Sequence, residues 1–179
     1  EIVQKLGLRP KQYVLATIHR AENTDDIDRL RSIFEGFEIV AKEIPVVLPI
    51  HPRTRQVLKQ KLSYDKIANH VILIEPVGYL DMIMLEKHSR LIATDSGGVQ
   101  KEAFFYGVPC VTLRSETEWV ELVELGWNRL VPVDSPLTVF KGLMGMLDVV
   151  GASGFPYGDG SAAGKILQRL ETKSLELLD

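Results

Sequence analysis

Short apolar runs alternate along the chain with longer segments in which apolar and polar residues recur at helical spacing. Each run is apolar at nearly every position, which predicts strands that are covered on both faces. Because each strand is followed by a helix, we expect a parallel sheet with helices on both sides. The expected strands are 13–18, 45–50, 71–74, 91–94, 109–113 and 130–133.

The clearest helical pattern runs from Asp25 to Ala41. Leu30, Ile33 and Phe37 recur there at three- and four-residue spacing, so their side chains form one apolar stripe. We expect Thr24, with the two aspartates that follow it, to supply the N-cap and a negative first turn. Further helices are expected at 54–62, 80–86, 99–106, 118–125, 136–149 and 162–171. The whole pattern predicts an α/β fold of Rossmann-like, doubly wound type.

Composition narrows the class of protein. The 179 residues are enough for one domain with a substantial core. Duplex nucleic acid requires a broad basic face, which the formal net charge of −3 does not suggest. Cys110 lies in an apolar run, where we expect a buried thiol rather than a reactive one. A single cysteine forms no disulfide within the chain, and no apolar run is long enough to cross a bilayer. We therefore expect a cytoplasmic protein that binds neither nucleic acid nor membrane.

Ligands of open parallel sheets bind at the carboxyl ends of the strands. Four polar segments directly follow expected strands and carry charged or imidazole side chains, so we expect them to form one site. They are His19–Asn23, His51–Arg53, Asp95–Gly98 and Arg114–Glu118.

The turn formed by Ser96, Gly97 and Gly98 is a candidate phosphate site. Two glycines let the backbone approach a ligand closely, and the helix that follows offers free N–H groups and a positive dipole end. A tight strand-to-helix connection without a ligand is the alternative. Arg114 ends the next strand, where its planar guanidinium suits a diphosphate; pairing with Glu116 or Glu118 explains it equally well.

Three further side chains are candidates at the same edge. Glu102, one turn into the helix after the glycines, suits two adjacent sugar hydroxyls, although a solvated glutamate is the simpler interpretation. His19 is able to hydrogen-bond a phosphate or assist proton transfer, or to serve a structural role, and the neighbouring Arg20 favours function. His51 ends the second strand in the same way, so we expect both histidines to face one cleft.

Other kinds of site are disfavoured. The four histidines and the single cysteine show no metal-ligand spacing. Ser96 lacks the Gly-x-Ser-x-Gly elbow of a serine nucleophile. No Gly-x-Gly-x-x-Gly motif follows the first strand, which disfavours a hydride-carrying dinucleotide cofactor. We expect no metal and no cofactor.

Five segments in this order resemble the non-hydrolysing UDP-N-acetylglucosamine (UDP-GlcNAc) 2-epimerases, which share the two-domain GT-B fold. The segments are Thr17–Asn23, His51–Pro52, Thr94–Ala103, Arg114–Glu118 and Pro156–Gly160. The resemblance implies that 13–179 form the C-terminal, UDP-binding domain and that 1–12 are a remnant of the interdomain linker. It also implies a reaction in which UDP is eliminated from UDP-GlcNAc and added back to give UDP-N-acetylmannosamine.

The resemblance implies a role for each matched residue. Ser96, Gly97 and Gly98 would bind the β-phosphate through backbone amides. Two side chains would hold the rest of the nucleotide, Glu102 at the ribose hydroxyls and Arg114 at the diphosphate. Backbone around 79–82 would line the uracil pocket. His19, as the catalytic residue of this half, would stabilise UDP as it leaves.

Some bacterial members of the family hold a second UDP-GlcNAc as an activator, and Arg20 and His51 match positions of that second site. The family's catalytic carboxylates belong to the N-terminal domain, so we expect this chain to bind UDP and UDP-GlcNAc without turnover and to need the missing domain for activity. Full-length members are commonly homodimers. Two alternatives stay open, a UDP-sugar-binding module that never turns its ligand over and the nucleotide domain of a GT-B glycosyltransferase.

Overall fold

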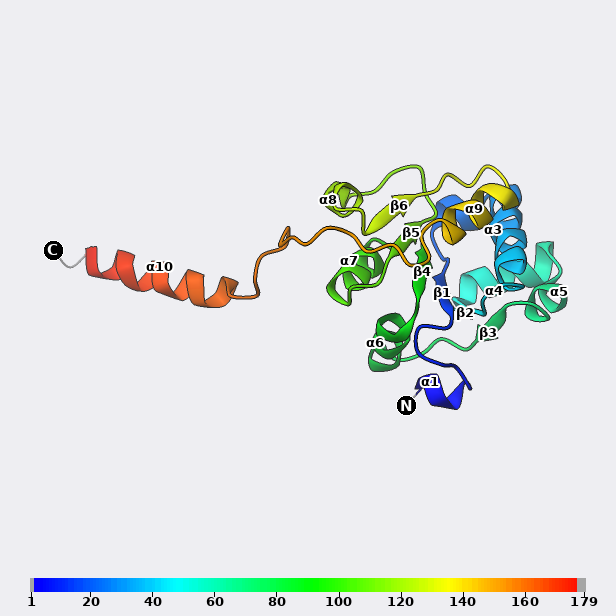
Figure 1. Ribbon diagram of the computed structural model, residues 1–179, viewed down its shortest axis with the longest axis horizontal. Coiled ribbons are helices and arrows are strands. Elements are labelled where there is room, and N and C mark those ends of the chain that lie inside the picture. The colour runs from blue at the N-terminus through cyan, green and yellow to red at the C-terminus, as the bar shows by residue number, and fades with distance from the viewer. Residues whose placement is uncertain (1, 177–179) are drawn as a thin grey trace.

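A computed structural model describes residues 2–176, and the side chains as far as residue 170. Within this part, six parallel strands form one sheet in the order β3-β2-β1-β4-β5-β6, with helices on both faces (Figure 1). The expected doubly wound α/β fold is therefore confirmed. The strands are β1 Val14–Thr17, β2 Val46–Pro49, β3 Ile72–Ile74, β4 Leu91–Thr94, β5 Cys110–Thr112 and β6 Asn128–Leu130.

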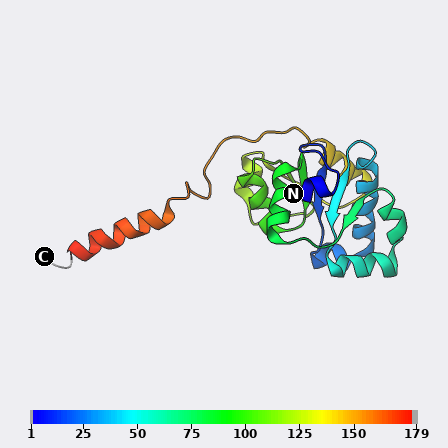
Figure 2. The ribbon, with the colours of Figure 1, turned by 90° about the horizontal axis from the view of Figure 1, so that it is seen from below.

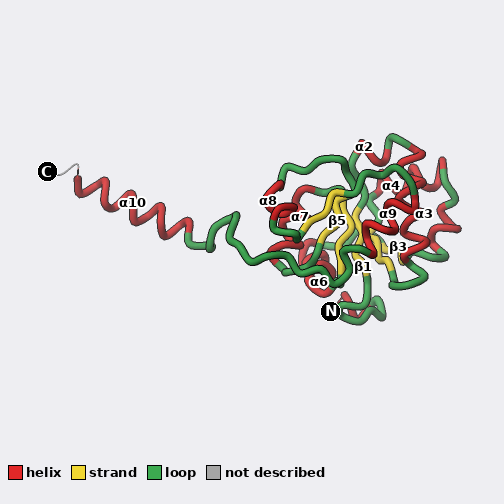
Figure 3. The backbone as a smooth tube through the Cα atoms, turned by 45° about the horizontal axis from the view of Figure 1, so that its top comes forward, coloured by secondary structure: helices red, strands yellow, loops and turns green. Residues whose placement is uncertain are grey.

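The helices occupy most of the segments that the sequence pattern predicted, and Figure 3 shows them around the sheet. Three of them, α1, α2 and α5, were not expected. The helices are α1 Ile2–Lys5, α2 Ala21–Thr24, α3 Ile27–Val40, α4 Pro52–Lys61, α5 Tyr64–Ala68, α6 Tyr79–His88, α7 Gly97–Phe105, α8 Val120–Glu124, α9 Pro136–Met144 and α10 Ala162–Glu176.

Strand side chains divide between two cores, one on each face of the sheet. Figure 2 shows helices on both sides of the strands. Val14 and Ala16 pack with α3, α4, α5 and α9, whereas Leu15 packs with α6 and α7. This alternation is the period of two that a strand imposes. Gly36 of α3 allows close contact with α9, because a Cβ at this position would meet the side chain of Val139 at 2.7 Å.

The sheet order reverses between its two central strands. From β1 the chain winds outward through β2 to β3, and the helices that connect these strands cover one face of the sheet. The chain then returns to β4, beside β1, and continues through β5 to β6, with α6 and α7 on the other face. The reversal leaves the carboxyl ends of β1 and β4 side by side, with Thr17 paired to Thr94. Such a switch point is where open α/β sheets bind ligands.

Several expected boundaries were wrong. The residues around Thr24 form the separate short helix α2, and Asp26 caps α3 by accepting hydrogen bonds from the main chain of Asp28 and Arg29. The last strand is Asn128–Leu130 rather than 130–133, and helix α9 ends at Met144. Pro132 in the expected strand has no N–H to donate to a ladder, and Val131 and Val133 instead pack into the core.

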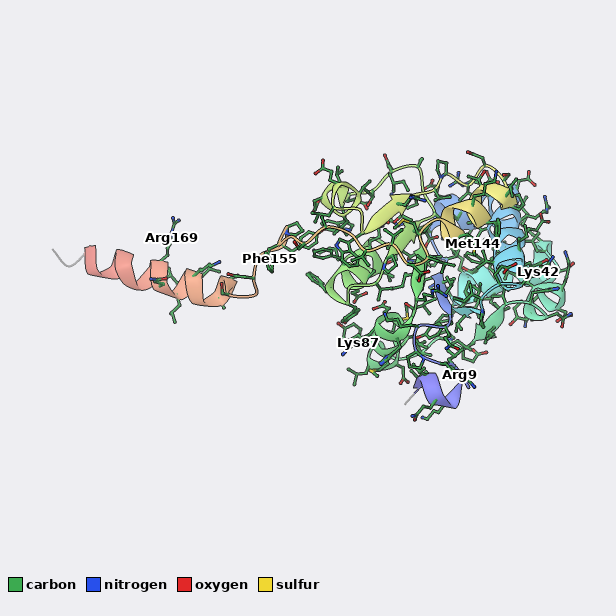
Figure 4. The ribbon with its side chains drawn as sticks, in the orientation of Figure 1. Arg9, Lys42, Lys87, Met144, Phe155 and Arg169 are labelled. Atoms are coloured by element: carbon green, nitrogen blue, oxygen red, sulfur yellow. The ribbon has the colours of Figure 1, made fainter. Side chains whose placement is uncertain are left out.

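The segments at the two ends of the domain differ in their contacts. Val3 of α1 is buried in the core that contains α6, so the expected linker remnant is packed against the domain. Beyond residue 150 an irregular segment leads away from the sheet to α10, as Phe155 on that segment and Arg169 on the helix show in Figure 4. Ile166, Leu167 and Leu170 of α10 are each more than half exposed. None of the described helices is long and apolar enough to cross a membrane.

Candidate functional site

The buried carboxylate of Asp95 joins the ends of three central strands. It accepts the main-chain N–H groups of His19 at 3.1 Å and of Arg20 at 3.0 Å. The Asn23 amide donates to Asp95 at 3.1 Å and to the carbonyl of Leu113, which follows β5, also at 3.1 Å. Asp95 has no exposed surface, so a buried carboxyl group with hydrogen bonds to both oxygens holds the loops after β1, β4 and β5 together.

The serine-diglycine turn lies directly after Asp95 and begins α7. Gly97 and Gly98 are the first residues of this helix, so their N–H groups have no acceptor within it. The amide of Ser96, by contrast, donates to the Thr94 hydroxyl at 2.9 Å. Gly98 is exposed, whereas Gly97 and Ser96 are half-buried. Backbone donors for an anion are therefore available at the two glycines rather than at all three residues.

Two arginines from neighbouring loops share one acidic partner, Glu118, which lies beside this turn. Arg114 is 4% exposed and donates to both carboxyl oxygens of Glu118, at 3.1 and 3.2 Å, and its Nε lies 3.6 Å from Glu22. The structure thus shows the pairing with Glu118, not Glu116, that the sequence left open. Arg20 lies 3.7 Å from the same Glu118, but 37% of its side chain is exposed, which leaves it the more accessible cation at Gly97.

His19 and His51 lie together, as expected from their places after β1 and β2. Their ring centroids are 5.7 Å apart and both line one pocket with a volume of about 230 Å³. His19 Nδ1 lies 3.5 Å from Asp95, and His51 Nδ1 accepts the main-chain N–H of Arg53. The other lining residues, from the strands, the loop before α6 and the starts of α6 and α7, are Thr17, Ile18, Pro49, Pro76, Val77, Met82 and Val99.

Glu102 lies further along α7 and has an unexpected acidic neighbour. Glu86 of α6 has no exposed surface, and neither of its carboxyl oxygens has a hydrogen-bond partner among the described residues. Burial, and next the negative charge of Glu102, raise the pKa of Glu86 to about 8. Tyr106 lies close to both carboxylates, and burial together with the charge of Glu86 raises its pKa. Burial therefore favours the protonated form of Glu86.

The structure brings the candidate residues to one edge of the sheet, and it adds two that sequence reasoning missed. Asp95 was part of a selected segment but had no role, although an acidic residue ending a buried strand is itself a signal. No sequence signal pointed to Glu86, because its helical segment resembles an ordinary amphipathic one.

The thiol of Cys110 is buried as expected, and burial raises its pKa to about 12. No group of three potential metal ligands occurs among residues 2–170.

Comparison with known proteins identifies relatives of this chain. A sequence model of UDP-N-acetylglucosamine 2-epimerase matches residues 1–171. The UDP-2,3-diacetamido-2,3-dideoxy-D-glucuronate 2-epimerase of Pseudomonas aeruginosa is 50% identical over 159 residues, which cover 88% of this chain and 44% of that relative. A UDP-N-acetylglucosamine 2-epimerase homologue of Methanococcus maripaludis is 42% identical over 172 residues, 95% of this chain and 47% of its own. The chain spans about half the length of the curated relatives it matches.

Solved structures agree with this assignment. The UDP-GlcNAc 2-epimerase of Methanocaldococcus jannaschii, in complex with UDP-GlcNAc and UDP, matches with a TM-score of 0.81 and 39% identity. The match covers 96% of this chain and 48% of that one. The fold is therefore that of one half of the two-domain GT-B arrangement. On the combined evidence of sequence, fold and the site at the strand ends, the chain belongs to the UDP-N-acetylglucosamine 2-epimerase family.

Proposed function

We propose that this chain is the UDP-binding half of an enzyme that interconverts UDP-GlcNAc and UDP-N-acetylmannosamine. The observation that carries the proposal is the convergence of a diglycine helix start, an accessible arginine and two histidines on the switch point between β1 and β4. A diphosphate needs donors and positive charge, and both are concentrated here. The relatives' names supply the class of reaction.

The diphosphate would bind across the start of α7. The free N–H groups of Gly97 and Gly98 would donate to the β-phosphate, and the positive end of the helix dipole adds to the attraction. Arg20 has a guanidinium nitrogen 3.6 Å from the position that a Cβ on Gly97 would occupy, so it reaches the same oxygens. Arg114, which is buried and paired with Glu118, would add positive charge near the phosphate and would contact it if Glu118 turned away.

The nucleoside would extend from the turn toward α6. Glu102 lies one turn after Gly98 on the same helix and would accept hydrogen bonds from the two ribose hydroxyls. Met82 lines the histidine pocket, and the backbone of 79–82 would flank the uracil ring.

The first half of the reaction would break the C2–H bond and the C1–O bond of the sugar and form a double bond between C1 and C2. In the second half a proton would return to C2 from the opposite face and the UDP oxygen would bond again to C1. The oxygen of the departing UDP takes the electron pair of the C1–O bond, so stabilising that charge is the main task of this half. His19, next to the turn, would donate a hydrogen bond to the leaving diphosphate. The groups that remove and return the C2 proton would come from the half of the relatives that this chain does not match.

Three further features would belong to the whole protein. Arg20 and His51 would also contact a second UDP-GlcNAc that acts as an activator. The exposed apolar residues of α10, Ile166, Leu167 and Leu170, would pack on the other half of the enzyme, and the complete protein would form homodimers. A helix with such a face is stabilised mainly by tertiary packing.

Calorimetry with UDP tests the binding function directly. We expect the 179-residue chain to bind UDP at one site per chain, and NMR of a mixture with UDP-GlcNAc to show neither free UDP nor epimerised sugar. Absence of UDP binding would overturn the proposal, and turnover would overturn the division of roles between the halves. The 50% identity to the P. aeruginosa relative makes UDP-2,3-diacetamido-2,3-dideoxy-D-glucuronate the first competing substrate to test in the complete enzyme.

A further inference from the structure

The indole of Trp119 holds the diglycine turn from outside the helix. Its Nε1 donates a hydrogen bond of 2.8 Å to the carbonyl of Gly97. Trp119 immediately follows Glu118 in the loop after β5, so one short loop supplies both the indole and the carboxylate at this turn. Its own main-chain N–H donates to the Thr117 hydroxyl at 3.1 Å, and that hydroxyl in turn donates to buried Gln100 of α7 at 2.6 Å.

Lys101 connects this indole to the segment that precedes α10. Its ammonium lies 4.3 Å from the centre of the Trp119 ring and 4.5 Å from the centre of the Tyr157 ring. The two rings are 5.9 Å apart and nearly perpendicular, at 89°. A cation between two aromatic faces is attracted to both. Lys101 lies one helical turn after Gly97, so the contact is made on the helix whose N-terminus forms the proposed phosphate site.

Tyr157 is itself fixed by aromatic contacts on α7. Its ring lies 5.9 Å from that of Phe104 and 5.7 Å from that of Phe105, both in edge-on geometry. Perpendicular aromatic pairs at these distances are favourable. The irregular segment 151–160 is therefore attached to the helix that begins at the turn, close to the place where Trp119 contacts it.

We infer that Trp119 is a positioning residue: its indole N–H fixes the Gly97 carbonyl so that the amides of Gly97 and Gly98 point at the diphosphate, and through Lys101 and Tyr157 it couples this turn to the segment that leads to α10. The inference rests on the proposed function of the turn. Donors that are already oriented before binding lose less entropy when the ligand arrives. Contacts through Trp119, Lys101 and Tyr157 thus connect the segment before α10 to the affinity of the phosphate site.

Two Trp→Phe variants provide a matched test. Trp119→Phe retains a ring beside Lys101 but loses the donor to Gly97. Trp127→Phe loses an equivalent donor, since the Trp127 indole donates to Ala152 in the same connecting segment at 2.9 Å, and its ring packs on Phe104 rather than on the turn. We expect Trp119→Phe to weaken UDP about three- to tenfold in calorimetry, the factor for one hydrogen bond, and Trp127→Phe, which affects only the segment, to weaken it no more than about twofold. Uridine, which lacks phosphates, should bind both variants equally.

Hydrogen exchange supplies a readout that needs no ligand. In Trp119→Phe the amide of buried Gln100, which donates to the Ser96 carbonyl at the start of α7, should exchange faster than in the unsubstituted chain, while the amides of β1 and β4 keep their protection. Tyr157→Leu should weaken UDP by a smaller factor, about twofold, because it cuts only the link to the segment. Unchanged UDP affinity and exchange in Trp119→Phe would overturn the inference. Failure of the unsubstituted chain to bind UDP would instead overturn the proposed function, and the exchange rates would still judge the role of Trp119.

Discussion

The guanidinium of Arg20 lies 3.7 Å from the carboxylate of Glu118, and the two side chains approach from loops that follow different strands. Atoms of both lie 3.6 Å from the position of a Cβ on Gly97. The cation closest to the proposed phosphate site is therefore neutralised by an acid of the same chain before any ligand binds. A diphosphate would take the place of Glu118 as the partner of Arg20.

Replacing Arg20 should reduce nucleotide affinity without affecting the fold. We expect Arg20→Ala to weaken UDP binding by roughly 1.5–3 kcal/mol, the range for a hydrogen bond to a charged group. Arg9→Ala, at an exposed position, is the matched control. Calorimetry measures both, and equal affinities for the two variants would remove Arg20 from the diphosphate site.

Arg114 should matter for both binding and stability. Its guanidinium is buried between Glu22 and Glu118, so Arg114→Ala brings two acids together without their cation. We expect a loss of UDP affinity of roughly 1.5–3 kcal/mol, together with a lower melting temperature. A variant that melts earlier but binds UDP normally would show that Arg114 is structural only.

Glu102 should distinguish nucleoside from phosphate recognition. A carboxylate that accepts the ribose hydroxyls contributes to UDP binding but not to pyrophosphate binding. We expect Glu102→Ala to weaken UDP more than it weakens pyrophosphate, measured by calorimetry with each ligand. Equal changes for both ligands would contradict ribose recognition.

Asp95 should be required for the junction of the three loops. In Asp95→Asn one acceptor oxygen becomes an NH₂ group that faces the main-chain donors of His19 and Arg20. We expect the free energy of unfolding to fall by about 1–3 kcal/mol, measured by urea denaturation. Asp134→Asn, at an exposed position, should change it little, and a similar loss in both variants would be the contrary result.

Glu86 makes the stability of the domain depend on pH. Its pKa is raised from 4.5 to about 8 in the folded chain, so between these values the folded state keeps a proton that the unfolded state has released. This contribution to stability is complete at acid pH and is lost as the pH rises through the window. Relative to Glu86→Gln, the unsubstituted chain should lose up to about 1.4 kcal/mol of unfolding free energy per pH unit. Parallel pH dependences of the two chains in urea unfolding would contradict this expectation.

The parallel sheet and the edge that carries the site were predictable because both follow from periodicity. Runs that are apolar on both faces require cover from helices, and the rule for ligand positions then selects the strand ends. The last strand was misplaced because it is short and begins with a polar residue. Asn128 is buried through side-chain hydrogen bonds to Gln100 and Thr112, which hydrophobic periodicity does not detect.

The internal pairing of the site could not be predicted from the sequence. The sequence places Arg114 and Glu118 four residues apart, but it did not predict that the arginine is buried. It also did not predict that Arg20 lies beside the same carboxylate. Contacts between residues far apart in the chain, such as Trp119 with Gly97 or Glu86 with Glu102, depend on how loops and helices meet in space. Local sequence patterns do not predict such contacts.

The carboxylate that joins the loops at the switch point accepts the backbone N–H of Arg20, whereas the Arg20 side chain lies beside Glu118. Any residue with a backbone N–H can supply the donor at this position. Variants at position 20 would therefore change the charge presented to the ligand while keeping the hydrogen bond that joins the loops.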